Sequence, residues 1–537
     1  MIRKSFLVSK KYYKIAVFGL IASILIYSLY TIYSTHMKFT SPSNTLVYDL
    51  NAKLILPEEG LYEGGIPKVF SDYIQAEQRN TEEFLFSANI IERQAADFLY
   101  KHIYSKVEKE SIFLNESYFQ NGIVGISNAS QYYFNKQVDE LSELELIFLL
   151  HKNVHNEESV NVLDDLTSFL DELQYKGIIN SKSVTQYNKD LPELLASTYN
   201  NWTFSQSFVQ HLIKELKDLG YKEEEFFRKG YSLHTYYNST FQKEIFESFL
   251  DERNFTEDLS PIQIEGAMVI IDKRTGALHA LMGGREFQHS NFNRATETTR
   301  QPASAFKPLI VFAPALERGW GPDSMLVDRP IQVGEFTPRN YDYEFRGELS
   351  LQEAFIKSYN VPTVWLHHQI GLEAGMDFVE NFNLFDLTEE DGFKNSVGFT
   401  SKGTSPLALA QAYTIFSNDG KMVSVRGIDR IYHPIGLKIY ENKIHEERFL
   451  EKETAETMTE LLVDVVENGT GKTAKIEGQT IAAKTGTTSY DGWFVGYNDE
   501  YLSAIWIGPD EVEPENRFHP GVYPSKIFHS VFSGIYQ

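Results

Sequence analysis

The chain has 537 residues, of which 42% are apolar, and this is enough for two or three domains with cores of their own. Its net charge of −24 argues against a nucleic-acid-binding protein, because phosphate backbones require basic patches. The absence of cysteine excludes disulfides, thiolate catalysis and cysteine-ligated metals. Histidines are scattered without metal-ligand spacing, so no metal or other cofactor is expected.

The first feature along the chain is an uncharged apolar run over residues 15–33, which is long enough to cross a bilayer. Five cations and no acidic residue precede it, which predicts that residues 1–14 stay in the cytoplasm and the bulk of the chain is exported. A cleaved signal peptide is the alternative, but the length of the run, its tyrosines and the lack of a small-residue cleavage site near Tyr33 oppose it.

Residues 46–200 are informative mainly between Tyr104 and Lys136. This stretch carries three short motifs, namely Phe113-Leu114-Asn115, Tyr118-Phe119-Gln120-Asn121-Gly122 and Gln131-Tyr132-Tyr133-Phe134-Asn135-Lys136. Residues 201–261 follow as a connecting segment, within which residues 208–216 have the pattern of an amphipathic helix.

From residue 262 onward the pattern changes to strands and helices. Residues 266–272 and 277–282 flank a four-residue turn and predict a β-hairpin. An apolar run then extends from Ser304 to Leu316, with Pro308 near its start, where a helix tolerates proline. Ser304 is therefore expected at a helix N-terminus, where free backbone N–H groups favour negative charge and could hold an oxyanion.

Two later segments are expected to face the same cleft. A capping box at Ser350–Glu353 starts a helix that ends near Lys357, and a new helix begins near Pro362, so residues 358–360 lie on the link between them. Residues 480–488, 491–497 and 501–508 read as three strands. Gly486, in the first of these strands, would let a substrate backbone approach closely.

Ser304 and Lys307 are the only Ser-x-x-Lys pair in the chain, and they project from one face of a helix turn. Serine is a poor nucleophile without a base, and lysine can act as that base only if burial or a nearby cation keeps it neutral. Ser358-Tyr359-Asn360 and Lys484-Thr485-Gly486 follow in the order typical of serine acyl-enzymes. Each motif is weak alone, since Ser87-Ala88-Asn89 also fits the second, but together they indicate acyl transfer.

The chain resembles a class A penicillin-binding protein over about residues 262–537. The resemblance implies an α+β fold: a penicillin-binding, β-lactamase-like transpeptidase domain with an antiparallel sheet flanked by helices, preceded by a small, mostly helical domain and one transmembrane helix. It also implies roles for the matching residues. Ser304 would be the acylated nucleophile and Lys307 its base, Ser358 would pass a proton to the leaving amine, and Asn360 would hold the substrate amide and Lys307. Lys484, Thr485 and Thr487 would bind the donor and its carboxylate, and the N–H groups of Ser304 and Thr487 would form the oxyanion hole.

Residues 46–200 resemble a truncated, degenerate form of the family's glycosyltransferase domain, which polymerises glycan strands from lipid II. The family's first catalytic glutamate falls on Glu77, but the aspartate next to it is replaced by Gln78. Too few residues separate Glu77 from Asn115 to hold the motifs that normally lie between them, and Glu92 is only a possible second carboxylate. We therefore expect the glycan-polymerising activity to be lost.

The sequence leaves several function classes open. The favoured one is a D,D-transpeptidase that acts on stem peptides ending in D-Ala-D-Ala, is acylated by β-lactams, and depends on a separate glycan polymerase at the bacterial cell membrane. A bifunctional enzyme, a D,D-carboxypeptidase or β-lactamase using the same site, and a non-catalytic wall-binding scaffold are the alternatives. No glutamate is evidently placed to activate a deacylating water, which disfavours the β-lactamase, and the intact motifs disfavour the scaffold.

Overall fold

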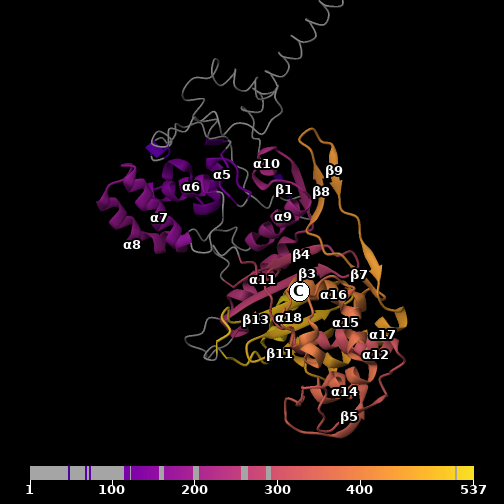
Figure 1. Cartoon of the computed structure of the whole chain (residues 1–537). Helices are drawn as coiled ribbons and strands as arrows, with labels where there is room; N and C mark the ends of the chain where they lie inside the picture. Colours follow the sequence, from indigo (N-terminus) through magenta and orange to yellow (C-terminus); the bar gives the residue numbers. More distant parts are fainter. Residues whose placement is uncertain are drawn as a thin grey trace, which may run out of the picture.

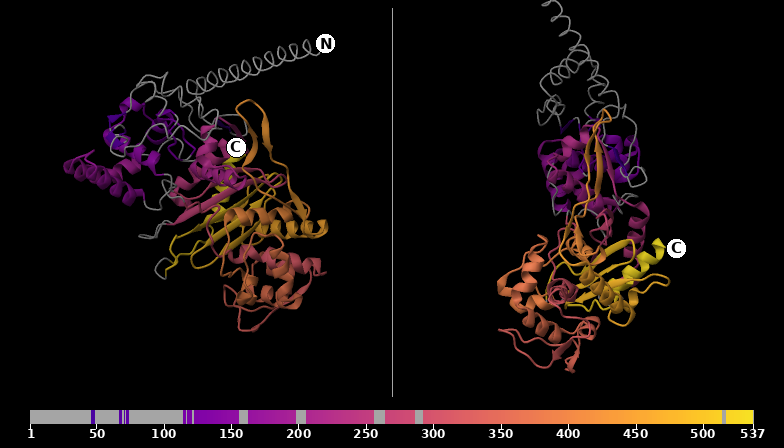
Figure 2. Two further views of the ribbon diagram at one scale, coloured as in Figure 1. Left: turned by 45° about the horizontal axis from the view of Figure 1, so that its top comes forward. Right: turned by 90° about the vertical axis from the view of Figure 1, so that its right-hand side faces the viewer.

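The structure, a computed structural model, describes residues 46–48, part of 67–73, and residues 114–536 apart from positions 116, 121, 156–161, 198–204, 256–263, 286–291 and 514–516. A helical unit lies at one end of the molecule, and a larger α+β body makes up the rest (Figures 1 and 2). No helix among the described residues is long and apolar enough to span a membrane, and residues 15–33 lie outside them.

Between residues 114 and 197 the described part of the helical unit contains α5 (Ile126–Phe134), α6 (Glu143–Val154), α7 (Val162–Tyr175) and α8 (Ser181–Ser197). A capping box fixes the start of α6, because the Ser142 hydroxyl accepts from the Glu145 backbone N–H at 3.3 Å while the Glu145 carboxylate accepts from the Ser142 N–H at 2.7 Å. Phe148, Leu170 and Leu173 are fully buried and join these helices into one core.

A four-stranded sheet connects this unit to the larger body. Its strand order is β1 (Leu46–Tyr48), β2 (Ser232–Thr235), β8 (Ile428–Tyr432) and β9 (Lys438–Glu441), with β1 parallel to β2 and the remaining pairs antiparallel. The predicted amphipathic helix is present as α9 (Gln206–Asp218), followed by α10 (Glu223–Arg228) and α11 (Ser239–Leu250). The Glu215 carboxylate of α9 accepts hydrogen bonds from the Gly427 and Ile428 N–H groups and so fixes the start of β8.

The central sheet of the larger body has five antiparallel strands in the order β11-β12-β13-β3-β4. The predicted hairpin and the three predicted C-terminal strands are confirmed as β3 (Glu265–Asp272), β4 (Leu278–Met282), β11 (Ala482–Thr487), β12 (Gly492–Tyr497) and β13 (Tyr501–Gly508). Both faces of this sheet are covered, which explains why β3 is apolar along nearly its whole length.

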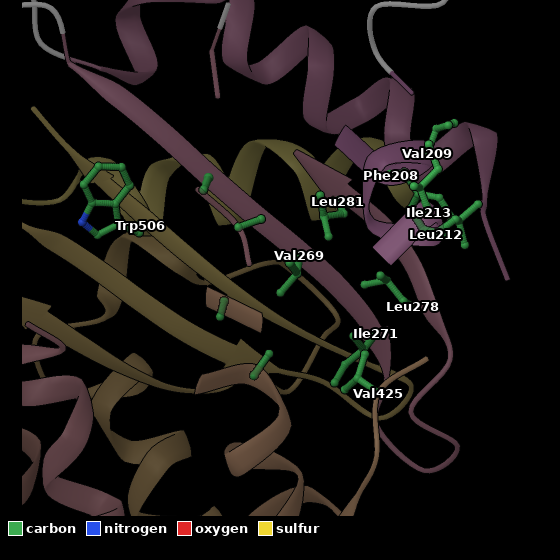
Figure 3. Close-up of a cluster of buried hydrophobic side chains, with 14 of the residues drawn as sticks. Phe208, Val209, Leu212, Ile213, Val269, Ile271, Leu278, Leu281, Val425 and Trp506 are labelled. Atoms are coloured by element: carbon green, nitrogen blue, oxygen red, sulfur yellow. The ribbon is translucent and has the colours of Figure 1, made fainter. Parts of the chain in front are cut away.

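Each face of the sheet packs against its own helices. Met268 and Ile270 of β3 contribute to a core with α11 and α18 (Tyr523–Ile535), while Val269 and Ile271 belong to the core on the opposite face. Figure 3 shows side chains of α9, among them Phe208 and Leu212, directed toward β3 and β4 on that second face. The fold is thus the expected α+β arrangement of an antiparallel sheet flanked by helices.

The remaining elements lie between β4 and β11 in the chain. They are α12 (Ala313–Glu317), β5 (Met325–Asp328), β6 (Gly347–Ser350), α13 (Leu351–Ile356), α14 (Asn360–Ile370), α15 (Leu372–Glu380), α16 (Pro406–Ser417), β7 (Lys421–Val423), β10 (Glu446–Arg448) and α17 (Lys452–Glu467). Of these, α17 packs against β11, and α16 packs against β13 and β3. Ser350 caps α13 as predicted, with its hydroxyl accepting from the Glu353 N–H at 3.1 Å. The next helix begins at Asn360, two positions before the predicted Pro362.

Candidate active site

Ser304 lies in a 3₁₀ turn, Ala303–Phe306, and not at the start of a regular α-helix as predicted from the sequence. The helical path continues as a π-helical segment, Pro308–Phe312, and becomes α-helical only from Ala313. Pro308 has no N–H to donate within the first turns, which is consistent with this irregular start. The predicted helical run to Leu316 is therefore present, since α12 (Ala313–Glu317) extends past it, but the geometry at Ser304 is that of a tight turn.

The turn is held in an unusual backbone conformation by its neighbours. Ala303, immediately before Ser304, has a φ of 49°, in the left-handed region that non-glycine residues rarely adopt. Its N–H donates to the Gly398 carbonyl at 3.2 Å, and a Cβ on Gly398 would lie only 1.9 Å from the Ala303 oxygen. Packing against Gly398 therefore fixes the orientation of the residue that precedes Ser304.

Lys307 is completely buried, and its amine is surrounded by oxygen atoms. Its Nζ lies 2.7 Å from the Ser358 carbonyl oxygen, 2.8 Å from Asn360 Oδ1, 3.3 Å from the Tyr359 carbonyl oxygen and 3.4 Å from Ser358 Oγ. Burial, and next the charge of Lys484, lower the pKa of Lys307 well below its usual value. No carboxylate is among the groups that shift this pKa, so neutral oxygen atoms alone replace the solvation that the amine loses.

Residues 358–360 form the predicted link between α13 and α14. Ser358 has a φ of 59°, so the chain reverses sharply there and presents the Ser358 hydroxyl and the Asn360 amide toward Lys307. The Asn360 amide is oriented by its other end, since Nδ2 donates to the Arg339 carbonyl at 2.8 Å. Buried Asn340 stabilises the link by accepting from the N–H groups of Asn360 and Val361, each at 3.0 Å.

Lys484, on strand β11, is also completely buried and reaches the same hydroxyl from the opposite side. Its Nζ donates to Ser358 Oγ at 2.9 Å and to the Thr485 carbonyl at 3.1 Å. Burial lowers the pKa of Lys484 from 10.5 to about 7. The structure thus places the Ser358 hydroxyl within hydrogen-bond distance of two buried amines, and burial lowers the pKa of both.

Strand β11 lies directly against the turn that carries Ser304. A Cβ added to Gly486 would lie 2.6 Å from the Pro302 carbonyl oxygen and 2.9 Å from the Ala305 nitrogen. Because Gly486 has no side chain, the Ser304 turn of the protein itself can pack closely against β11. The sequence interpretation expected a close approach by substrate at Gly486 and did not foresee this contact. Thr485 Oγ1 lies 2.6 Å from Thr470 Oγ1, and Thr487, at the end of the strand, is exposed.

A cavity of about 510 Å³ opens beyond the end of β11. It is lined by residues that follow this strand and by residues that precede the Ser304 turn, including Arg300, Gln301, Thr488 and Tyr490. Arg300 Nε donates to Asp491 Oδ1 at 2.6 Å, and Trp506 Nε1 donates to the same oxygen at 3.0 Å. Arg300, Asp491 and Trp506 thus form a hydrogen-bonded wall of the cavity that adjoins the candidate site.

Two protein families match this chain, one after the other along the sequence. Residues 79–172 match the transglycosylase family, and residues 266–508 match the penicillin binding protein transpeptidase domain. That combination, with the transpeptidase match covering the residues described above, decides the family. The chain belongs to the class A penicillin-binding proteins.

Curated relatives of this family are similar along most of the chain. Penicillin-binding protein 1F of Bacillus subtilis (strain 168) is 31% identical over 476 residues, which are 85% of this chain and 64% of the relative. Penicillin-binding protein 4 of the same organism is 26% identical over 442 residues, which are 76% of this chain and 70% of the relative. The chain thus spans about two thirds of the length of these penicillin-binding proteins.

Solved structures of the family show the same fold. Penicillin-binding protein 1A from Haemophilus influenzae superposes with a TM-score of 0.57 at 16% identity and covers 92% of both chains. The PonA1 protein of Mycobacterium tuberculosis in complex with penicillin V gives a TM-score of 0.53 at 21% identity, covering 61% of this chain and 93% of that chain. At these identities the likeness establishes the fold alone.

Most residues singled out for the acyl-transfer site lie close together, and Ser304 lies in the turn that leads into Lys307. Lys307, Ser358, Asn360 and Lys484 form a connected hydrogen-bonded cluster. Thr485, Gly486 and Thr487 lie on the strand beside the Ser304 turn. Glu77, the predicted remnant of the glycosyltransferase site, lies outside the described residues. Sequence reasoning missed the supporting roles of Asn340 and Thr470, although Thr470 stood within a stretch that resembled the class A family.

Proposed function

We propose that this chain is a membrane-anchored serine D,D-transpeptidase that cross-links peptidoglycan stem peptides through an acyl-enzyme on Ser304. The observation that best supports this proposal is the environment of Lys307. Its amine is buried, and burial together with the charge of Lys484 lowers its pKa. A neutral amine has two N–H groups, and the two shortest contacts of Nζ are to the Ser358 carbonyl and Asn360 Oδ1. Donating to these acceptors leaves the lone pair free to take a proton.

In the first half-reaction Lys307 takes the proton of the Ser304 hydroxyl while Ser304 Oγ attacks the carbonyl between the two D-alanines. The N–H groups of Ser304 and Thr487 hold the developing oxyanion, a feature typically worth about 10²–10³-fold in rate for each donor. The carbon–nitrogen bond then breaks, and D-alanine leaves after its nitrogen receives a proton through the Ser358 hydroxyl. The position of that hydroxyl, 3.4 Å from Lys307 Nζ and 2.9 Å from Lys484 Nζ, supports this relay.

In the second half-reaction an amine of a neighbouring stem peptide attacks the ester carbonyl. Its proton travels back through the same groups, and Ser304 leaves as a hydroxyl. Lys484 and the Thr470–Thr485 hydroxyl pair are proposed to bind the terminal carboxylate of the donor, supported by the 2.6 Å contact between the two hydroxyls. A β-lactam would acylate Ser304 by the first half-reaction, since its strained amide mimics the D-Ala-D-Ala bond.

One experiment separates the transpeptidase from the alternatives that use the same site or no catalysis. The full-length protein is incubated with a fluorescent penicillin, and in parallel with a synthetic donor stem peptide and an acceptor amine, and the products are separated. Cross-linked product supports the proposal, hydrolysed product alone indicates a D,D-carboxypeptidase, and no labelling indicates a scaffold. Ser304→Ala is the control, since it removes the nucleophilic hydroxyl by deleting a single oxygen atom at a half-buried position.

The helical unit is proposed to have lost glycan polymerisation, so that the protein relies on a separate polymerase for nascent strands. The transglycosylase match covers only residues 79–172 and does not include Glu77, which supports a shortened domain. The same match favours a bifunctional enzyme as the second candidate. Purified full-length protein with lipid II in detergent distinguishes the two, with Glu77→Gln as control. Glycan polymer formed by the wild type but not by Glu77→Gln would establish the bifunctional enzyme.

A further inference from the structure

A hairpin far from the candidate active site carries an exposed apolar tip. Strands β8 and β9 are joined by a tight turn in which the His433 N–H donates to the Leu437 carbonyl at 2.8 Å and the Gly436 N–H donates to the His433 carbonyl at 2.7 Å. Ile435 is 79% exposed, Leu437 60% and Ile439 39%. Three large aliphatic side chains therefore crowd a single tip, whereas exposed apolar residues on soluble surfaces are normally scattered.

The base of the hairpin is rigid, so the position of the tip is fixed by the fold. Ile428 and Ile431 of β8 are buried, and β8 pairs with β2 in the four-stranded sheet. The bidentate contact of the Glu215 carboxylate with the Gly427 N–H holds the first residue before β8 onto α9. The exposed aliphatic residues thus project from a well-packed base and do not belong to a loosely attached loop.

The sheet register shows in which direction the tip points. Leu46, the first residue of β1, pairs with Ser232 of β2, and Ser232 in turn pairs with Tyr432, the last residue of β8. The hairpin turn therefore leaves the sheet at the same end at which the chain enters it from its N-terminal segment. Figure 1 shows this end of the molecule, with β1, α10 and the β8–β9 tip, opposite the end that carries α14 and β5.

The chain before Leu46 limits how far this end can lie from a membrane. The apolar run over residues 15–33 is the proposed anchor, and only residues 34–45 separate it from β1. Even fully extended, a segment of this length spans no more than about 45 Å. The end of the sheet that carries the hairpin tip is therefore tethered close to the bilayer surface, with the active-site lobe on the far side.

The chemistry of the tip suits a lipid surface. Between residues 433 and 440 the chain carries His433 and Lys438 and no acidic residue, although the protein as a whole has a net charge of −24. The backbone of the turn is hydrogen-bonded internally, so its apolar side chains can enter an acyl boundary without leaving the turn's own N–H and C=O groups unpaired. The single lysine of this stretch is neutralised by an ion pair with Glu441 at 2.7 Å, so the tip itself presents aliphatic side chains, as segments that enter a membrane interface do.

We propose that the tip formed by Ile435, Leu437 and Ile439 inserts into the outer surface of the bilayer that carries the anchor. This second attachment would fix the tilt of the ectodomain and the height of the Ser304 site above the membrane. The inference rests on the membrane anchoring proposed above, but it does not depend on the catalytic activity of the site.

The absence of cysteine in the natural chain allows a direct test. The variant Ile435→Cys is labelled with an environment-sensitive fluorophore, and the full-length protein is reconstituted into phosphatidylglycerol–phosphatidylethanolamine vesicles. The matched control is Tyr343→Cys, since Tyr343 is 72% exposed and lies between β5 and β6 at the opposite end of the molecule. We expect aqueous iodide to quench the label at 435 several-fold less than the label at 343, and lipid-borne nitroxide to quench only the label at 435.

Each other outcome overturns the inference in a recognisable way. Equal iodide quenching at the two positions would mean that the tip stays in water. Protection from iodide without quenching by lipid nitroxide would mean that protein covers the tip, either a second copy or another part of this chain. Protein that fails to float with vesicles after an alkaline wash would remove the anchor and the inference together, whereas floating protein with an unprotected tip would remove the inference alone. Fluorescent penicillin labelling of both variants checks that the ectodomain is folded.

Discussion

Replacing Lys484 by methionine should inactivate the enzyme and make it more stable. Methionine is close to lysine in shape and fills the same buried space without a charge. The Lys484 amine has a pKa lowered by burial from 10.5 to about 7, which corresponds to a cost of about 4 kcal/mol near neutral pH relative to the unfolded chain. Replacing a buried charge by an apolar group of similar volume is often stabilising for this reason.

The gain is reduced by the hydrogen bonds that Lys484 makes. Its Nζ donates to Ser358 Oγ at 2.9 Å and to the Thr485 carbonyl at 3.1 Å, and losing each contact costs about 1 kcal/mol. The net stabilisation should be about 2 kcal/mol, which corresponds to a rise of roughly 5 °C in the Tm of the transpeptidase transition. Labelling by fluorescent penicillin should meanwhile fall steeply, because the proposed carboxylate site and the proposed proton relay lose a member.

The pH dependence gives the decisive measurement. Between about pH 7 and pH 10.5 the unfolded chain binds a proton at Lys484 that the folded chain has released, so the stability of the wild type rises with pH over this range. Lys484→Met has no such proton. The stability difference between variant and wild type should therefore be largest near pH 7 and shrink toward pH 10.5, as measured by thermal unfolding across that range. A variant that is destabilised by the same amount at every pH would refute the lowered pKa.

Three further substitutions probe the Ser304 turn and its base. Lys307→Arg should reduce acylation by several orders of magnitude because guanidinium stays protonated, and near-normal penicillin labelling would place the base elsewhere. Gly486→Ala should abolish labelling or slow it severely, because its Cβ would lie 2.6 Å from the Pro302 carbonyl oxygen; an unchanged acylation rate and Tm would contradict this close contact. Ala303→Gly should raise the free energy of unfolding by up to about 1 kcal/mol, because the φ of 49° suits glycine. A clear loss of stability would show that the turn is unstrained.

The sequence predicted the regular elements well because their signals are local. The β3–β4 hairpin, the three C-terminal strands and the Ser350 cap all depend on residues within a few positions of one another, and all are confirmed. The joint presence of Ser304, Lys307, Ser358 and Lys484 predicted one site, and the structure joins the last three by hydrogen bonds.

What the sequence missed depends on contacts between distant segments. The turn that carries Ser304 packs against Gly398 and Gly486, and no local pattern reveals these contacts. Asn340 supports the Ser358–Asn360 link from twenty residues away, and its signal in the sequence is that of any loop asparagine. The wall of the adjoining cavity likewise joins Arg300 to Asp491 across nearly two hundred residues.

The pairing of β1 with β2 has a mechanical consequence. The chain leaves β1 at Tyr48, builds the whole helical unit, and returns to β2 beside its starting point, since Tyr48 pairs with His234. The strands are parallel, so a pull on the segment before Leu46 against the transpeptidase domain after Thr235 loads their hydrogen bonds in shear and all at once. Tension would thus pass directly from β1 to β2, and the looped-out helices would carry none of it. A unit in that position can change or decay without weakening the connection on either side.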